Sequence, residues 1–242
     1  IAKDFKINNF IGFSLANNHI FDSGLDGYNE TILNLQKNGI FSFGSGLNIN
    51  EAYKAASVEI DQTRVSFIGS SYRPLAGINK AGVADAYNPI LLEKIKEAKN
   101  NADVVIVMPH TGIEFLDYPI PRDQSLFRSI IDAGADLVVG GHPHCVQVKE
   151  NYNNSWIYYS IGDLIFDHAD DKVWTEASKI KSKWKKMSTA QRTRWLDKID
   201  DLARKQNTSD EDVRAIRDEF GLHMSEEVEV AEAVQMDEEF WA

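Results

Sequence analysis

The chain has 242 residues, of which 43% are hydrophobic and 26% are charged, as expected of a globular protein with a substantial core. Its formal net charge of -11 argues against a general nucleic-acid binder, because contacts with phosphate need a basic surface. Cys145 is the only cysteine, which excludes a disulfide within the chain, and no apolar stretch approaches the length of a membrane span. The chain starts at Ile1 in what looks like the middle of a helix, so the lack of a leader says nothing about its cellular compartment.

Short apolar runs alternate with amphipathic stretches over the first two thirds of the chain. Residues 10–15 are an apolar run that predicts a buried strand ending at an Asn-Asn-His loop. A helix should follow, beginning at Ser23 and ending at Gly39, with an inner stripe of Leu25, Tyr28, Ile32 and Leu35. Residues 41–43 predict a brief strand, and residues 57–60 and 65–69 predict a hairpin.

The same alternation continues through the next part of the chain. Pro89 opens a predicted helix that runs through Ala98, and residues 103–108 form a strand that is apolar throughout after Asp103. Pro121 opens the next helix, which ends at Gly134, and residues 135–139 and 156–161 are the last two strands. Strands and helices that alternate in this way predict a layered α/β fold, in which ligands gather outside the carboxyl ends of the strands.

The chain changes character after residue 171, so we expect a domain at 1–171 and a charged helical segment at 172–242. The first half of that segment is rich in Lys and Arg, and its end is acidic. Capping boxes at Ser188 with Gln191 and at Thr208 with Glu211 predict two helix starts. We expect the basic and acidic parts to pair within the chain. A nucleic-acid or lipid-surface role for the basic part is the weaker alternative, because the acidic part would compete.

Two histidines, His142 and His144, stand one residue apart just after the strand at 135–139. Because alternate residues point to the same side and Pro143 stiffens the turn, the two imidazoles can serve one metal ion or two neighbouring ions. The alternative is a pair of polar loop residues, since this spacing also arises by chance. Metal binding is favoured because two other predicted strands end in residues of the same kind.

Those two strands end at Asn18 with His19 and at His110. Asn18 offers an amide oxygen to a hard metal and His19 can act as a general acid, although an Asn pair also suits a tight turn without function. His110 ends the most hydrophobic strand, where a histidine without function would need a buried partner, so we favour a metal ligand. Glu114 can orient His110 or touch substrate, and Asp22 can orient His19 or cap the next helix.

Four motifs stand along the chain in an order typical of one protein family. They are Asn17-Asn18-His19 with Asp22 and Gly24, His110-x-Gly112-x-Glu114, Gly141-His142-Pro143-His144 with Gln147, and Tyr159-Ser160-Ile161-Gly162-Asp163-x-Ile165-Phe166. This order resembles the CapA family, the bacterial capsule and poly-γ-glutamate synthesis proteins within the calcineurin-like metallophosphoesterase superfamily. The resemblance covers roughly residues 5–168.

The resemblance implies a layered α/β sandwich of the metallophosphatase type, with a dinuclear metal site at the strand ends. It makes His19 the catalytic acid or a clamp on the substrate, with Asp22 and Glu114 as the other catalytic candidates. The implied cofactors are two divalent ions, with Mn, Fe, Zn and Mg not distinguished, and the implied location is the bacterial cell envelope. The implied metal ligands are Asn18, His110, His142 and His144.

Two departures from the family's pattern bear on these expectations. The family's first motifs, a Gly-Asp after the first strand and an Asn-Leu-Glu carboxylate motif, are absent, so we expect them upstream of Ile1 and expect the fold to be incomplete at its amino terminus. Without those carboxylates the chain should hold at most one ion, weakly, through His110, His142 and His144, and a sheet edge should be unpaired. Asp163 stands where members usually have Asn, which leaves substrate specificity open.

The expected function is metal-assisted hydrolysis of a phosphoester in envelope-polymer synthesis, with His19 protonating the leaving oxygen. The partners would then be a phosphoester or envelope-polymer substrate and a polymer synthase complex, with no nucleic acid. The alternative is a non-catalytic binding or assembly subunit of a polymer synthase that uses the same fold. The sequence favours a metal site and leaves the choice between these two functions open.

Overall fold

A computed structural model of the chain describes residues 2–164, 186–188, 190, 191 and 194. The chain divides into two compact units, Ile1–Gly162 and Asp163–Ala242. In the second unit the expected capping box is present, because the Ser188 N–H donates to Gln191 Oε1 over 2.9 Å and the Gln191 N–H donates to Ser188 Oγ over 3.3 Å. The other expectations for 172–242, including the boundary at 171 and the second capping box, lie outside the described residues.

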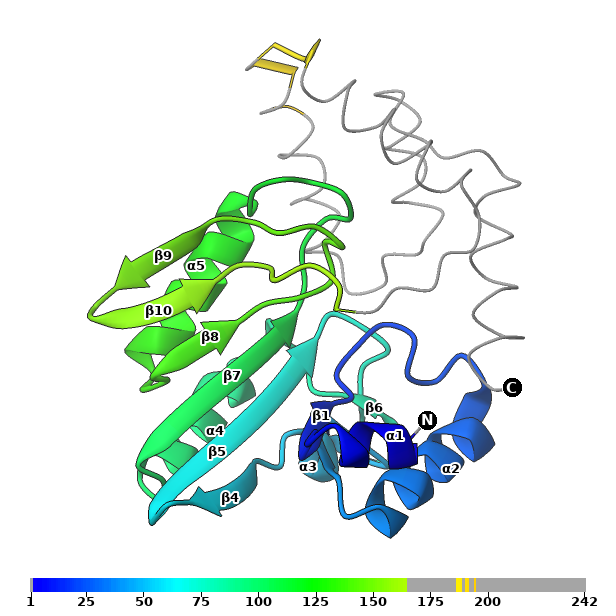
Figure 1. Ribbon diagram of the computed structural model, residues 1–242. Helices are drawn as coiled ribbons and strands as arrows, with labels where there is room; N and C mark the ends of the chain where they lie inside the picture. Colours follow the sequence, from blue (N-terminus) through cyan, green and yellow to red (C-terminus); the bar gives the residue numbers. More distant parts are fainter. Residues whose placement is uncertain (1, 165–185, 189, 192–193, 195–242) are drawn as a thin grey trace. The chain divides into compact units, whose positions relative to one another are not determined.

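The first unit is built on a six-stranded sheet (Figure 1). Three neighbouring pairs in its centre are parallel, whereas the first and last strands pair antiparallel with their neighbours. The parallel strands therefore all end at one rim of the sheet. The strand order is β4 (Ala56–Ile60), β5 (Thr63–Ser71), β7 (Val104–His110), β8 (Leu137–Val139), β10 (Ser155–Tyr158) and β9 (Lys149–Tyr152).

Two helices, α4 (Ile90–Lys99) and α5 (Pro121–Asp132), cover one face of this sheet (Figure 1). Residues of β7 are buried at alternate positions, so Val105 and Val107 point towards the helices and belong to the same core cluster as Leu91 and Phe127. All four of these side chains are at most 1% exposed. Burial of such aliphatic and aromatic side chains contributes roughly 1.5–3 kcal/mol each, which makes this cluster the main stabilising core.

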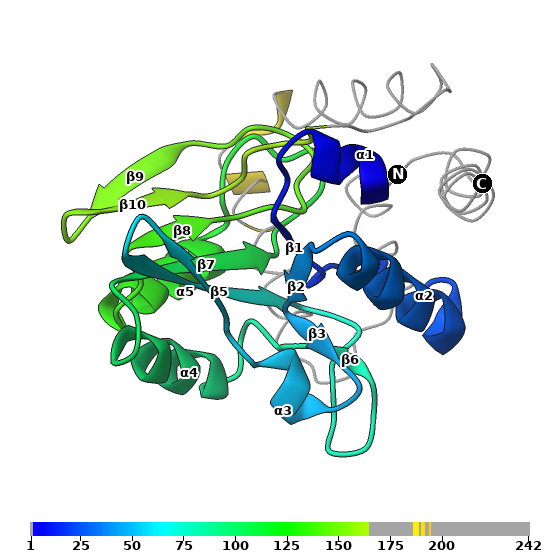
Figure 2. The same cartoon turned by 60° about the horizontal axis from the view of Figure 1, so that its bottom comes forward.

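A second, smaller layer lies on the other face of β5 (Figure 2). It consists of α1 (Ala2–Ile7), β1 (Gly12–Ser14), α2 (Gly24–Lys37) and β2 (Phe41–Phe43), and β1 pairs with β2 in parallel. The rings of Phe41 and Phe43 each lie 5.6 Å from Phe67, which points away from the helices because it neighbours the helix-facing Ile68. Helices, a main sheet and this second layer confirm the expected layered α/β fold.

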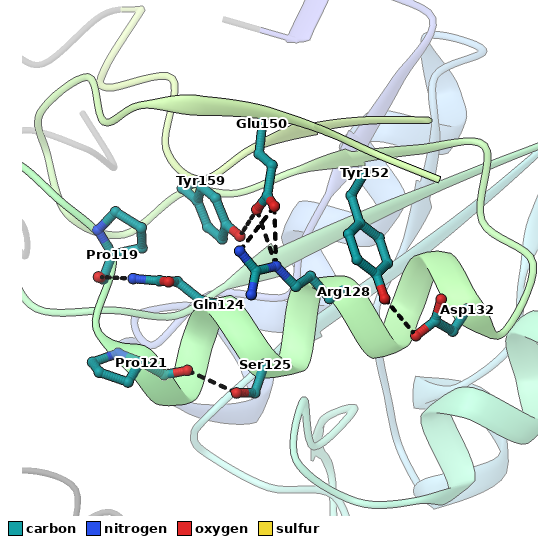
Figure 3. Close-up of polar contacts among 9 residues, drawn as sticks. All are labelled: Pro119, Pro121, Gln124, Ser125, Arg128, Asp132, Glu150, Tyr152 and Tyr159. Atoms are coloured by element: carbon teal, nitrogen blue, oxygen red, sulfur yellow. Dashed lines mark hydrogen bonds and ion pairs between the residues drawn. The ribbon is translucent and has the colours of Figure 1, made fainter. Parts of the chain in front are cut away.

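A partly exposed polar network ties the hairpin β9–β10 to α5 (Figure 3). The Arg128 guanidinium donates to both carboxylate oxygens of Glu150, over 2.8–3.2 Å, and the Tyr159 hydroxyl donates to the same carboxylate over 2.6 Å. These hydrogen bonds lower the pKa of Glu150, and the bond from Arg128 makes the largest contribution. One turn further along α5, the Tyr152 hydroxyl donates to Asp132 over 3.2 Å. The network therefore holds β9 and the residue after β10 against α5.

Most expected elements are present, with shifted ends. The strand expected to end at residue 69 runs to Ser71, and the one expected to end at 108 runs to His110. Ser23 precedes α2 as expected, but its side chain makes no capping hydrogen bond. None of the helices that the structure describes has both the length and the apolar character needed to cross a bilayer. The short elements β3 (Ser45–Gly46), α3 (Ile49–Ala52), β6 (Gly82–Val83) and β9 were not expected.

Candidate metal centre

The backbone ladder at the ends of the parallel strands places the candidate residues side by side. His110, the last residue of β7, is bridged to Gly141 in the loop after β8. Gly141 donates to Pro109 O over 3.0 Å and accepts from the Thr111 N–H over 3.1 Å. On its other side β7 pairs with β5, and Ser71 Oγ donates to His110 O over 3.1 Å. His110 therefore stands at the rim between the end of β5 and the loop that carries His142 and His144.

The loop after β8 holds both of its histidines in an unusual backbone conformation. His142 has φ of 98° and His144 has φ of 52°, values that favour glycine and cost a residue with a side chain of order 1–3 kcal/mol. Pro143 packs against Gly112, where an added Cβ would lie 2.9 Å from the proline ring, and Gly112 itself has φ of 127°. The Phe115 N–H donates to Pro143 O over 2.8 Å. The two loops therefore pack on each other, which brings Glu114 to the histidines.

Glu114, His142 and His144 form a group suited to a metal ion. One ligand atom from each lies within 4.8 Å of the others, with His142 buried and the other two residues half-buried. Two imidazole nitrogens and one carboxylate oxygen are a donor set that zinc and other first-row transition metals accept. Glu114, which the sequence analysis placed as an orienting or substrate-contacting residue, lies within this group, and the ligand role of His110 stays a prediction. The residues present fit a divalent ion.

A second pair of metal-type donors lies beside that group. Asn18 Oδ1 is 3.0 Å from His110 Nε2, about the spacing of two adjacent ligands on an ion with bonds of about 2.1 Å. The His110 and His142 rings are 5.0 Å apart between centroids. Asn18 comes from the loop after β1 and His110 from β7, so this pair joins the second layer to the main sheet. All four expected metal ligands therefore meet at one rim.

The electrostatic environment keeps His110 in the form that binds metals. Burial is the largest cause, followed by the neighbouring His142, His144 and His19, and together they hold the pKa of His110 well below its usual range. Glu114 opposes this shift. A neutral imidazole has a free lone pair, so His110 can ligate an ion without first losing a proton.

His19 lies at the outer side of the site, next to Asp22. Its Nδ1 is 2.6 Å from Asp22 Oδ2, its Nε2 is 2.8 Å from Asn18 Nδ2, and its backbone N–H donates to Asn17 Oδ1 over 2.9 Å. The side chains of His19 and Asp22 are 44% and 41% exposed, so the pair is open to a molecule arriving from solvent. A histidine oriented by a carboxylate at the edge of a metal site can transfer a proton to a bound substrate.

The sequence reasoning missed Tyr72, whose ring lies 5.0 Å from the ring of His142. Tyr72 directly follows β5, which runs two residues further than expected and so reaches the same rim as His110. The available signal was an aromatic residue immediately after an apolar strand of a parallel sheet, the position that ligand-contacting residues occupy in such folds.

The profile described as bacterial capsule synthesis protein PGA_cap matches residues 1–168 of the chain. The chain belongs to this family. It is 35% identical over 179 residues to the PGA biosynthesis protein CapA of Bacillus subtilis, covering 72% of this chain and 46% of that protein. It is 33% identical over 182 residues to the capsule biosynthesis protein CapA of Bacillus anthracis, covering 72% of this chain and 43% of that one. The resemblance to the CapA family is confirmed, and the chain spans about half the length of these relatives.

Among solved structures, the chain is similar to a candidate 5'-nucleotidase from Staphylococcus aureus in complex with α-ketoglutarate. The similarity has a TM-score of 0.49 and 16% sequence identity, over 66% of this chain and 34% of that chain.

Proposed function

We propose that this PGA_cap family member is a metal-dependent hydrolase of the phosphoester type that acts in the synthesis of a capsular glutamate polymer. The supporting observation is the meeting of Glu114, His142 and His144 with the Asn18–His110 pair at one rim of the sheet. The relatives' names connect the family to capsule and PGA biosynthesis. The ligand types and the exposed His19–Asp22 pair favour hydrolysis as the chemistry.

In this proposal each residue of the site has one task. His142, His144 and Glu114 would hold one divalent ion, and Asn18 with His110 would provide ligands for a second. Such ions would supply Lewis-acid polarisation of a phosphoryl oxygen and a lower pKa for a water molecule at the site. Asp22 fixes the orientation of the His19 ring through the 2.6 Å contact at Nδ1. In the reacting complex His19 Nε2 carries a proton in place of the hydrogen bond that it accepts from Asn18, and it gives that proton to the leaving oxygen, which its exposure allows it to reach.

A second function, a non-catalytic subunit of a polymer synthase, is favoured by one specific observation. The relatives are named biosynthesis proteins, and one from Mycobacterium tuberculosis is named a probable synthesis accessory protein, at 28% identity over 170 residues. In this alternative the same ions hold an anionic ligand or a partner without cleaving a bond. Both functions share the metal site and differ only in whether His19 transfers a proton.

Two measurements on the purified 242-residue chain test the proposal. Elemental analysis should find a divalent metal that is lost in a His142→Ala variant, because His142 is the most buried ligand of its group. Hydrolysis of bis-p-nitrophenyl phosphate with added Mn²⁺ should fall about a hundredfold in His19→Ala. The matched control is Gln36→Ala, at an exposed position of α2, which should keep the metal content and the hydrolysis rate of the wild-type chain.

The outcomes separate the two functions. Metal bound with no hydrolysis would favour the non-catalytic subunit, and hydrolysis that is unchanged in His19→Ala would reject the role proposed for His19. No metal in the wild-type chain would reject both.

A further inference from the structure

A buried carboxylate lies next to the loop that carries Glu114, and none of the roles assigned so far uses it. Asp123 stands in the first turn of α5 and is only 3% exposed. Burying an ionised group costs free energy unless other groups compensate its charge. Two groups do so here, because the amino-terminal end of α5 favours negative charge and the Tyr87 hydroxyl donates to Asp123 Oδ1 over 2.7 Å.

Tyr87 is itself held at the end of β5. Asp85 is bridged to Ser71, the last residue of β5, and the Tyr87 N–H donates to Asp85 Oδ1 over 2.9 Å. The Arg122 guanidinium carbon lies 3.3 Å over the centre of the Tyr87 ring. Burial, the largest cause, and the charge of Asp123 hold the pKa of Tyr87 well above its usual range, so its hydroxyl keeps the proton that it donates. The Tyr87–Asp123 bond therefore ties α5 to the rim of the sheet.

The carboxylate reaches the loop at Gly112. A Cβ added to Gly112 would lie 2.9 Å from the Pro143 ring and 3.7 Å from Asp123 Oδ2. Gly112 has φ of 127°, a conformation that L side chains rarely adopt, and no larger residue fits in this place. Asp123 and Pro143 therefore both pack against the backbone of Gly112, two residues before Glu114.

The direction of Glu114 depends on this packing. Phe115 has φ of 60°, which is strained for a residue with a side chain, and its N–H donates to Pro143 O over 2.8 Å. Strained conformations persist only where the surroundings hold them. Pro143 belongs to the loop after β8, which is strained as well, so it is not a fixed support. Asp123 belongs to α5, whose inner side lies in the main core.

We propose that Asp123, held by the Tyr87 hydroxyl, is a positioning residue that keeps Gly112 packed on the loop after β8 and so directs Glu114 towards the two histidines. Asp123 acts through the loop and is not one of the ligands. The inference rests on the proposed function in one respect, because that function supplies the ion that Glu114 would bind.

Competition with a chelating dye for Zn²⁺ measures what this positioning contributes. Asp123→Asn keeps an acceptor for the Tyr87 hydroxyl and loses only the charge, whereas Asp123→Ala loses both. Asp123→Ala should therefore bind Zn²⁺ at least about tenfold more weakly than Asp123→Asn, a comparison in which the charge plays no part. Tyr87→Phe should weaken binding several-fold alone and have no further effect in Asp123→Ala, because the two residues act as one unit.

The same helix offers a matched control pair. Asp132, at the end of α5, also accepts from a tyrosine hydroxyl, that of Tyr152, over 3.2 Å (Figure 3). Asp132→Ala and Tyr152→Phe should keep the Zn²⁺ affinity within about twofold of wild type. Ile95→Ala controls for stability, because it leaves a cavity in the core on α4 and should lower Tm without changing the affinity of the folded chain.

Amide hydrogen exchange of the metal-free chain reads the loop itself. The Phe115 N–H should be protected in wild type and in Asp132→Ala, because it is bonded to Pro143 O. In Asp123→Ala it should exchange at least about tenfold faster, since a loop without its support opens more often.

The proposal is overturned if Asp123→Ala and Asp123→Asn bind Zn²⁺ equally well, if Ile95→Ala loses as much affinity as Asp123→Ala, or if Phe115 exchange is the same in Asp123→Ala and Asp132→Ala. Should Asp123→Ala fail to fold, Tyr87→Phe decides, and affinity and exchange equal to those of Tyr152→Phe overturn the proposal. A chain that binds no Zn²⁺, but whose Phe115 exchange depends on Asp123, defeats the metal-dependent function and leaves the positioning role standing.

Discussion

Two adjacent glycines before His142 offer a sharp test of how the site is supported. A Cβ added to Gly140 would lie 2.1 Å from the carbonyl oxygen of Tyr159 and 2.7 Å from the Phe127 ring. A Cβ added to Gly141 would have His110 Nδ1 as its nearest atom, at an ordinary 3.5 Å. Neither glycine has a positive φ, so backbone preference does not separate Gly140→Ala from Gly141→Ala.

The size of the effect follows from which atoms must move. The carbonyl oxygen belongs to backbone, the Gly140 N–H donates to Tyr158 O over 2.7 Å, and Phe127 is only 1% exposed. Overpacking of this kind costs about 1–3 kcal/mol, and rigid surroundings place Gly140→Ala near about 3 kcal/mol. At about 2–4 °C per kcal/mol for a chain of this size, Tm should fall by about 6–12 °C.

Thermal unfolding followed by circular dichroism in metal-free buffer measures this difference. Gly141→Ala should unfold within about 1 kcal/mol of wild type, helped slightly by the lower entropy of its unfolded chain. Equal Tm values for Gly140→Ala and wild type, or an equal loss in both variants, would refute the packing argument.

Three further predictions concern charge. Glu114→Gln should weaken metal binding at least about tenfold, because it removes the one negative charge of its ligand group. Glu93→Gln, on the exposed side of α4, should leave metal affinity unchanged, and competition with a chelating dye measures the affinity of both variants. The folded chain keeps His110 neutral, whereas the unfolded chain protonates it, so the metal-free protein should lose stability as pH falls below about 6.5, by up to about 1.4 kcal/mol per pH unit. Urea unfolding at several pH values measures this loss, which should be smaller in His110→Asn. Glu150→Gln should lower Tm by at most about 4 °C, since it weakens the bonds from Arg128 and Tyr159 at a partly exposed site. Glu97→Gln removes only an exposed pair with Lys94 and should leave Tm unchanged.

The layered α/β architecture could be predicted because its signals are local. The apolar run at 104–108 and the prolines before α4 and at the start of α5 each specify an element from neighbouring residues alone. Parallel strands of one sheet share one end, so the meeting of His110 and His142 followed from the pattern of strands and helices.

The second layer could not be predicted in the same way. Residues 41–43 were expected as a strand, but nothing near them indicates that β2 leaves the main sheet and packs on it. That placement depends on Phe67 and on a close approach of Gly44 to Gly69, where a Cβ on Gly44 would lie 2.9 Å from the Gly69 Cα. Such contacts join residues far apart in the chain, and local periodicity does not encode them.

The position of Glu114 depended on backbone conformations that the pattern does not show. Sequence spacing placed it near His110, as an orienting or substrate-contacting residue. In the structure the positive φ values of Gly112 and Phe115 turn the loop towards Pro143, and Glu114 meets His142 and His144. Its role as a ligand stays a prediction.

The amide of Asn18 has a direction, and that direction assigns the protons on two rings. Its NH₂ group donates to His19 Nε2, so its oxygen must accept from His110 Nε2–H, and His19 carries its own proton on Nδ1 towards Asp22. An ion that took both Asn18 Oδ1 and His110 Nε2 would displace that proton and move His110 to its other tautomer. Binding of an ion at Asn18 and His110 should therefore change the tautomer of the His110 ring, and the ¹⁵N chemical shifts of that ring would report the change.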